Sequence, residues 1–232
     1  MLITIGVTAK KTPKVIILCF HDIDGKGKYS IKSKELESIF NLVNKNNYKV
    51  LNLRQWDKLR IKKGTIDRNM VIFTFDDGYR SLFRNVIPLL TKFKFAATFF
   101  IYLDRYNSRS KFYQNLASLP INLEVGAHSF SHSHLKVIKK SKIIYQELFL
   151  AKKKLEYLIS KPVYSFAWPY GSYSKKLVEL AKLAGYKLQV STSYRSYYWD
   201  ESKDVYGRFT ITKKNPINQV KKILKQIGGL GF

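Results

Sequence analysis

Two adjacent carboxylates, Asp76 and Asp77, directly follow an apolar run at 70–75 that has the length and composition of a buried strand. Removing a charged group from water costs several kcal/mol unless a partner compensates for the lost hydration. A metal ion is one partner that makes such a pair tolerable. Asp-Asp-Gly is also an ordinary turn sequence, and on these residues alone a solvated turn is the better interpretation.

His128 and His132 are four positions apart, so both side chains can point the same way from one helical turn or a tight loop. Two histidines and one carboxylate from another strand form a facial set that leaves metal coordination positions open. A hydrolytic metal site needs those positions for a water molecule and a substrate oxygen. His134 is out of phase with His132, and we expect it to face away as a polar loop residue.

Apolar runs of strand length alternate along the chain with segments of helical spacing. We predict strands at 15–20, 48–53, 70–75, 96–101, 123–127, 163–167, 187–192 and 208–211. We predict helices at 31–46 (with Ser33 as N-cap), 82–93, 141–159, 174–184 and 217–227. The alternation indicates an α/β domain over residues 15–232, with a parallel sheet that is open or closed into a barrel, behind an N-terminal extension at 1–14.

The unusual polar residues each follow a predicted strand. His21 follows the first strand, the two aspartates the third, His128 the fifth, and a Trp-Pro-Tyr-Gly turn at 168–171 the sixth. The carboxyl ends of the strands in a parallel barrel converge on one face, where catalytic groups are found. We therefore expect these residues to share one site. No GxGxxG or Walker-type loop is present, which disfavours a nucleotide-binding fold.

The net charge of +26, from 42 Lys+Arg against 16 Asp+Glu, would attract a polyanion. However, the lysines are spread along the chain and far outnumber the arginines, which are the preferred readers of phosphates and bases. Compositional drift is the better explanation of this charge. We predict no nucleic-acid partner and only a secondary attraction to anionic cell surfaces.

No apolar run approaches the ~18 residues needed to cross a bilayer. The apolar stretch at 1–9 has no basic residues before it and is a poor signal peptide. Three expectations about the compartment stay open: a cytoplasmic protein, export by another route, or a leader absent from this sequence. The single cysteine, Cys19, lies within a predicted strand, and we interpret it as a small buried apolar residue.

Three motifs together resemble those of the NodB-type polysaccharide deacetylases, carbohydrate esterase family 4. The segment 74–78 (Thr-Phe-Asp-Asp-Gly) is similar to the first family motif, 128–132 (His-Ser-Phe-Ser-His) to the second, and 168–171 to the third. The resemblance covers roughly residues 15–212. It implies a distorted (β/α)7 barrel, in agreement with the predicted strands.

The resemblance also implies residue roles. Asp77, His128 and His132 would bind one divalent metal ion, with zinc expected and cobalt or nickel as alternatives. Asp76 would be the general base that takes a proton from the attacking water. The backbone N–H of Tyr170 would help to hold the oxyanion.

Two features depart from the usual family pattern. The third motif normally begins with an arginine that orients the base, whereas this chain has Trp168, which leaves the tuning of Asp76 open. The late Leu-x-His motif that supplies the general acid is absent, so His21 is the only remaining candidate acid. The poly-β-1,6-N-acetylglucosamine deacetylase branch is similar in this respect. Its barrel is circularly permuted and carries the acid in a Tyr/Phe-His-Asp element, which the segment 20–22 resembles.

The resemblance implies a metal-dependent hydrolase, expected to act as a monomer, that removes N-acetyl groups from a GlcNAc-containing polysaccharide. The substrate would be an exopolysaccharide such as poly-N-acetylglucosamine, or a peptidoglycan-like or chitin-like glycan, and the family usually acts outside the cytoplasm or at the cell envelope. The alternatives are a non-catalytic glycan-binding relative and an O-acetyl ester deacetylase. Residues expected to face the sugar are Trp168, Pro169, Tyr170 and Trp199. Trp199 belongs to an aromatic loop at 194–206 that could equally be a packed loop closing the barrel end.

Overall fold

The computed structural model describes residues 12–107 and 110–228. Most of the predicted extension at 1–14 lies outside the described residues, and Lys14 is already the first residue of strand β1. The strands are β1 (Lys14–Phe20), β2 (Lys49–Val50), β3 (Met70–Phe75), β4 (Ala97–Ile101), β5 (Leu123–Ala127), β6 (Ser165–Ala167), β7 (Leu188–Val190), β8 (Tyr197–Tyr198) and β9 (Phe209–Thr210). They form one sheet whose main order is β7-β6-β5-β4-β3-β1-β8, with β2 beside β3 and β9 beside β1.

The predicted strands are confirmed, although several are shorter than expected. All pairings are parallel except that of β8 with β1. Residues of β1 alternate between two apolar clusters, so Ile16 and Leu18 face one layer and Val15 and Ile17 the other. A parallel strand that is covered on both faces reads as a continuous apolar run, which is why β1 and β3 could be located from the sequence.

The sheet curls until its two sides approach each other across the segment 206–210. Tyr206 forms an isolated bridge with Val190 of β7, and three positions later β9 pairs with β1. The backbone N–H of Ser191 donates to the carbonyl of Tyr206 at 2.8 Å. This curled, mostly parallel sheet agrees with the predicted distorted barrel. The circular permutation stays a prediction.

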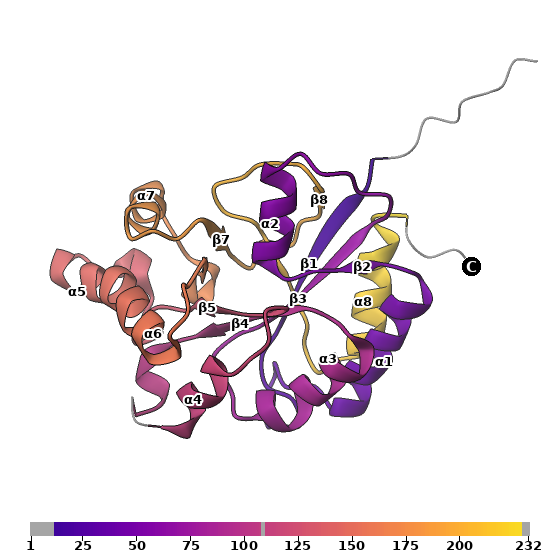
Figure 1. The fold of residues 1–232 in the computed structure, drawn as a ribbon, viewed down its shortest axis with the longest axis horizontal. Helices are drawn as coiled ribbons and strands as arrows, with labels where there is room; N and C mark the ends of the chain where they lie inside the picture. The colour runs from indigo at the N-terminus through magenta and orange to yellow at the C-terminus, as the bar shows by residue number, and fades with distance from the viewer. Residues whose placement is uncertain (1–11, 108–109, 229–232) are drawn as a thin grey trace, which may run out of the picture.

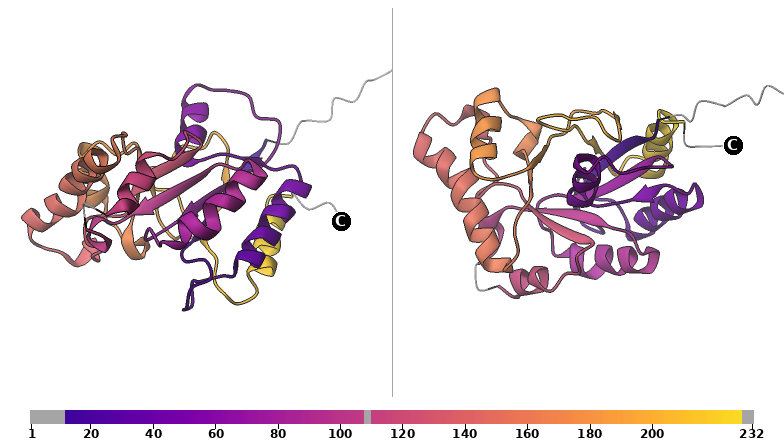
Figure 2. Two further views of the ribbon diagram at one scale, coloured as in Figure 1. Left: turned by 60° about the horizontal axis from the view of Figure 1, so that its bottom comes forward. Right: turned by 45° about the horizontal axis from the view of Figure 1, so that its top comes forward.

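Helices surround the sheet (Figures 1 and 2). They are α1 (Ser33–Lys45), α2 (Leu53–Ile61), η1 (Leu82–Val86), α3 (Ile87–Phe93), η2 (Leu103–Arg105), α4 (Lys111–Ala117), η3 (Leu135–Val137), α5 (Ser141–Tyr145), η4 (Gln146–Leu150), α6 (Ala151–Ile159), η5 (Pro169–Gly171), α7 (Lys175–Leu183) and α8 (Pro216–Lys225). Helix α1 contacts α3 and α8 on one side of the sheet. No helix in the described part of the chain is both long and apolar enough to span a membrane.

The N-cap of helix α1 lies one residue earlier than predicted. It is Lys32, and Glu35 accepts a hydrogen bond from the backbone N–H of Lys32 at 2.8 Å. Ser33, the predicted N-cap, lies inside the first turn because its backbone N–H and hydroxyl both donate to Asp24. The loop carboxylate therefore satisfies the first backbone donor of the helix, the N–H of Ser33 itself.

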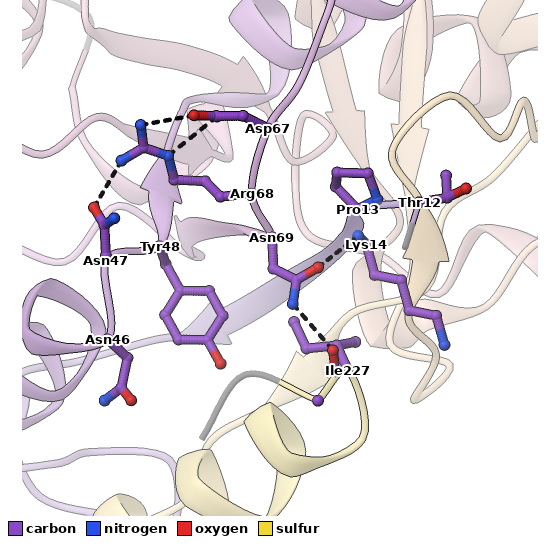
Figure 3. A pocket seen from close by; sticks show the side chains of 11 residues that line it. Thr12, Pro13, Lys14, Asn46, Asn47, Tyr48, Asp67, Arg68, Asn69 and Ile227 are labelled. Carbon is purple, nitrogen blue, oxygen red and sulfur yellow. Dashed lines mark hydrogen bonds and ion pairs between the residues drawn. The ribbon is translucent and has the colours of Figure 1, made fainter. Parts of the chain in front are cut away.

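The amino ends of the strands are joined to the C-terminal helix through Asn69 (Figure 3). Its side-chain oxygen accepts from the backbone N–H of Lys14 at 2.9 Å, and its amide donates to the carbonyl of Ile227 at 3.0 Å. The same residues border a pocket of about 270 Å³. This pocket lies at the amino ends of the strands, whereas the predicted site residues follow their carboxyl ends.

We predict that Asn69→Ala lowers the free energy of unfolding by about 1–2 kcal/mol, because a backbone donor and a backbone acceptor both lose their partner. Urea denaturation followed by circular dichroism measures this change. Asn44→Ala, on the exposed face of α1, is the matched control and should change the value by less than about 0.5 kcal/mol. Equal effects of the two substitutions would contradict the assigned role of Asn69.

Candidate metal centre and active site

The predicted polar residues meet at the carboxyl ends of the strands, around a pocket of about 360 Å³. Its walls include His21, Asp76, Asp77, His128, His132, Trp168 and Tyr170. Strands β1, β3, β5 and β6 each end in one of the segments that supply these residues. The expectation that independent strands deliver their polar residues to one place is therefore confirmed.

Asp77, His128 and His132 form a group that could hold a metal ion. One ligand atom from each lies within 4.8 Å of the others. Asp77 Oδ1 lies 3.5 Å from His128 Nε2 and 3.3 Å from His132 Nε2. This oxygen is buried and has no hydrogen-bond partner among the described residues. A buried carboxylate oxygen without a partner is costly, and a cation between the three side chains would satisfy it, so these residues fit a metal.

The orientation of His128 suits metal binding. Its Nδ1 lies 2.8 Å from the carbonyl oxygen of Ala167. A carbonyl can only accept, so Nδ1 carries the proton and the lone pair of Nε2 is free to bind a metal. Burial, together with the nearby His128, lowers the pKa of His132. The lowered pKa favours the neutral imidazole, which is the form that binds metals.

Several non-glycine residues at this site have positive φ: Asp77 (70°), Ser129 (70°), His132 (60°) and Tyr170 (57°). Such conformations are sparsely populated, and each costs on the order of 1–3 kcal/mol. They turn the chain sharply after each strand and aim the side chains into the pocket. Strain of this kind persists only where the surrounding structure holds it.

Glu147 holds the loop that carries the second histidine. This buried carboxylate accepts from the backbone N–H groups of Phe130 (2.9 Å) and Ser131 (3.0 Å) and from the hydroxyl of Ser131 (2.5 Å). It belongs to η4, a π-helical turn between α5 and α6. Glu147 was not among the predicted site residues, although an acid beside the apolar stripe of the predicted helix at 141–159 was the available signal.

Arg208 supplies the arginine that the third motif lacks. Its Nη1 and Nη2 donate to the two carboxylate oxygens of Asp76, each at 2.7 Å, and both side chains are buried. Its Nε donates to the carbonyl of Ser191 at 3.1 Å, and Nη1 also donates to Thr74 Oγ1 at 2.9 Å. Burial would raise the pKa of Asp76, but the guanidinium outweighs it and holds this pKa well below the usual range. Asp76 is therefore a carboxylate at neutral pH.

Cys19, His21 and Asp76 form a second group of possible ligand atoms within 4.8 Å of one another. Two facts argue against a cation there. The guanidinium of Arg208 already neutralises Asp76. Burial raises the pKa of Cys19 well above its usual value, so its sulfur stays a thiol and donates to Asp76 Oδ2 at 3.4 Å. The group around Asp77 is the better metal centre.

His21 lies on the wall of the same pocket. Its ring stacks on Tyr29 with 5.0 Å between centroids, and its buried Nδ1 has no partner among the described residues. Burial lowers the pKa of His21, although the charges of Asp76 and Asp77 act in the opposite direction. The imidazole is placed to exchange a proton with a molecule in the pocket.

The predicted sugar-facing residues are only partly brought to the pocket. Tyr170 is 66% exposed, and its ring lies 4.8 Å from that of His132, while Trp168 is buried in the pocket wall and donates to Gln189 at 3.1 Å. Pro169 is buried and does not line the pocket. His134 is exposed, lies edge-on to Tyr170 and is not part of the metal group, as expected.

Trp199 lies elsewhere. It packs against the apolar cluster that contains Trp56. Its backbone N–H donates to the carbonyl of Pro13, and its backbone carbonyl accepts from the Trp56 indole at 2.8 Å. Its loop contains β8, whose pairing with β1 the sequence did not indicate. The packed-loop alternative fits this placement. Besides Trp168 and Tyr170, the aromatic residues that line the pocket are Tyr29 (43% exposed) and Tyr194 (67% exposed).

Comparisons with known proteins agree with this geometry. The sequence profile of the family described as polysaccharide deacetylase matches residues 63–189, more than half of the chain. The matched part contains both aspartates and the metal-centre histidines but neither His21 nor Arg208. The chain is 28% identical over 172 residues to a poly-β-1,6-N-acetyl-D-glucosamine N-deacetylase of Staphylococcus epidermidis, covering 68% of this chain and 59% of that protein.

Solved structures show the same fold. The deacetylase PplD of Streptococcus pyogenes, in complex with acetate, superposes with a TM-score of 0.78 at 16% identity, over 91% of this chain and 98% of that one. A polysaccharide deacetylase of Bacillus cereus, BC0361, gives 0.74 at 22% identity, over 92% of this chain and 69% of that one. At these identities the likeness concerns the fold.

We predict that His128→Gln and His132→Gln each weaken zinc binding by more than the roughly 10- to 100-fold lost when an outer-shell partner of a metal ligand is removed. Competition with a chromophoric chelator measures the affinity. His134→Gln is the matched control and should bind zinc as the unmodified protein does. The assignment of the metal centre fails if the His134 variant loses as much affinity as the other two.

We predict that Arg208→Met lowers the free energy of unfolding of the metal-free protein by about 3–5 kcal/mol at neutral pH, because it leaves the buried Asp76 carboxylate without its partner. The folded pKa of Asp76 is depressed, so the stabilisation is complete above its unfolded pKa of about 4 and is lost as the pH falls further. The difference between the two proteins should therefore shrink below about pH 4.

Urea denaturation at several pH values tests this expectation. Arg68→Met removes an arginine from an exposed ion pair with Asp67, and it should leave stability nearly unchanged. A difference between Arg208→Met and the unmodified protein that grows toward acid pH would contradict the assignment.

Proposed function

The chain belongs to the polysaccharide deacetylase family, and from that premise we propose that it is a metal-dependent hydrolase that removes N-acetyl groups from a GlcNAc-containing glycan. The single observation that supports this most is the buried Asp77 oxygen without a partner, which faces two imidazoles beside the ionised Asp76. A metal ligand set next to a charged base is what amide hydrolysis requires. The S. epidermidis relative, named for this reaction on poly-β-1,6-N-acetylglucosamine, supports the same class of substrate.

Each residue then has a role. Asp77, His128 and His132 hold a divalent ion, which when bound polarises the acetyl carbonyl and makes a water molecule more acidic. Two nitrogens and one oxygen suit zinc, with cobalt or nickel as alternatives. Asp76, kept ionised by Arg208, accepts a proton from the attacking water.

The departing nitrogen must be protonated, and the water molecule supplies both protons overall. Water adds to the acetyl carbon, the C–N bond breaks, and acetate and a glycan amine are formed. His21, on the wall of the pocket, is placed to donate a proton to the departing nitrogen. The backbone N–H of Tyr170, in a turn fixed by a positive φ, would help to stabilise the developing oxyanion. The exposed rings of Tyr170 and Tyr194 suit the apolar faces of sugar units.

The non-catalytic alternative has two grounds: Trp168 stands where the family has an arginine, and the usual late Leu-x-His motif is absent. Arg208 reaches Asp76 from β9's side of the sheet, so the base has an arginine partner after all. The first ground for lost activity is removed, and the second depends on the proposed role of His21. O-acetyl esters use the same chemistry at the carbonyl, and a test with both kinds of substrate distinguishes them.

The decisive experiment incubates an N-acetylglucosamine tetramer with protein loaded with zinc, cobalt or nickel and detects loss of acetyl groups by mass spectrometry. Asp76→Asn should reduce the rate by about 10²- to 10⁴-fold, because it removes the proton acceptor. Asp200→Asn, the same change at an exposed residue, should keep the rate within about twofold. A tetramer left intact with every metal, while an O-acetylated sugar is hydrolysed, would overturn the N-deacetylase proposal in favour of an esterase.

A further inference from the structure

A second pocket, of about 570 Å³, lies next to the metal centre along the chain. It is lined by residues that include Asp22, Tyr79, Arg80, Arg84, Arg105 and Tyr106. Asp22 follows His21 directly, and Tyr79 is two positions after Asp77. The two loops that supply the catalytic pocket therefore continue into the walls of this second pocket, which we call the arginine pocket.

The three arginines of this pocket differ from most other arginines of the protein. Carboxylate oxygens lie within ion-pair distance of four arginines elsewhere: Arg60, Arg68, Arg195 and Arg208. Among the described residues, no carboxylate lies within that distance of Arg80, Arg84 or Arg105. In a chain whose charge is carried mainly by lysine, three arginines without acidic partners converge on one pocket.

Two of these guanidinium groups are held in place by aromatic rings. Arg105 lies over the ring of Tyr79 at 4.0 Å, and its Nη1 donates to the hydroxyl of Tyr102 at 3.0 Å. Arg80 lies 5.3 Å from the ring centre of Tyr106. Arg105 Nε also donates to the hydroxyl of Tyr106 at 3.4 Å, so Arg105 offers chiefly its Nη2 to a ligand. Guanidinium N–H groups match the oxygens of a carboxylate or phosphate.

The acidic residues of the arginine pocket are engaged in their own loop. Asp22 Oδ1 accepts from the hydroxyl of Ser81 at 2.5 Å and from the backbone N–H of Ile23 at 2.9 Å. Asp24 accepts from the backbone N–H of Ser33 at 2.8 Å. These carboxylates stabilise the loop after β1 and do not neutralise the arginines through ion pairs. The pocket has three guanidinium groups against these two carboxylates, so its net charge is positive.

Tyr102 connects the arginine pocket to the metal centre. The ring of Tyr102 lies 5.3 Å from that of His132, and its hydroxyl accepts from Arg105. A polymer with its acetyl group at the metal centre can thus extend a neighbouring unit toward the arginines. A charged group at that point would meet N–H donors that are already oriented.

We propose that the arginine pocket binds an oxyanion, a carboxylate or a phosphate, on a unit of the glycan adjacent to the one that is deacetylated. The preferred substrate is then an acidic N-acetylated glycan, bound more tightly than a neutral homopolymer. This inference rests on the proposed deacetylase function and specifies its substrate class.

The first test compares three N-acetylated tetramers: neutral N-acetylglucosamine, an alternating tetramer with N-acetylmuramic acid, which carries carboxylates, and a phosphorylated N-acetylglucosamine tetramer. The variant Arg80→Gln/Arg84→Gln should raise KM for the acidic tetramers about tenfold or more, since each arginine would donate charge-assisted hydrogen bonds. KM for the neutral tetramer should change far less. The two acidic tetramers distinguish a carboxylate from a phosphate.

The matched control is Arg68→Gln/Lys142→Gln, which removes the same charge at exposed positions outside both pockets. It should leave all three KM values unchanged. A general electrostatic effect would instead raise KM for the acidic tetramers equally in both double variants. The inference is overturned if the unmodified protein shows no preference for acidic tetramers, or if Arg80→Gln/Arg84→Gln affects neutral and acidic tetramers equally.

A binding measurement separates this inference from the proposed function. Calorimetry with N-acetylglucosamine 6-phosphate and with N-acetylmuramic acid should show tighter binding than N-acetylglucosamine, lost in Arg80→Gln/Arg84→Gln and kept in the control. If these probes bind in this way while no tetramer is deacetylated, the anion site stands and the deacetylase proposal fails. If the neutral tetramer is deacetylated but acidic probes bind no better than N-acetylglucosamine, only the anion site is refuted.

Discussion

The buried ion pair between Arg208 and Asp76 joins the fold to the chemistry of this protein. Two opposite charges inside a protein are tolerated only when geometry is good and the remaining donors and acceptors are satisfied. Here the guanidinium bonds both carboxylate oxygens, a backbone carbonyl and Thr74. The segment 206–210 that carries the arginine also bridges β7 and β1. The contact that keeps Asp76 ionised therefore depends on the strand arrangement that curls the sheet.

The rigid strands allow strained loops at their carboxyl ends. Strand β3 is buried throughout, yet the residue two positions after it, Asp77, has a positive φ. His132, in the loop after β5, also has a positive φ, and Glu147 anchors the N–H groups of the two residues before it. Conformations of this kind need a supporting structure that cannot relax. The packed sheet and the anchoring carboxylate provide that structure, so the metal-centre side chains are held before any ion binds.

The strands and the metal centre could be predicted from sequence because both have local signals. β1 and β3 are continuous apolar runs, and the predicted ligands lie within five positions of a strand end. Arg208 had no such signal, because it lies 132 positions from Asp76 and the ion pair exists only once the sheet has curled. Trp199 was predicted at the sugar-facing surface from its aromatic neighbours. Tertiary packing against Trp56 decided its place, and aromatic composition alone cannot distinguish a binding surface from a packed loop.

The position of each arginine is more informative than the net charge. Lysine ammonium groups are strongly hydrated, and a chain rich in them can carry a large positive charge without a specific partner. Arginine in this protein is used selectively. One holds the buried Asp76 carboxylate, others pair with exposed or buried acids, and three line a pocket beside the candidate metal centre. A charge of +26 would attract any polyanion weakly and in a salt-dependent manner. Fixed guanidinium groups select an oxyanion by geometry, so a preference that survives at high salt would have to come from them and not from the lysines.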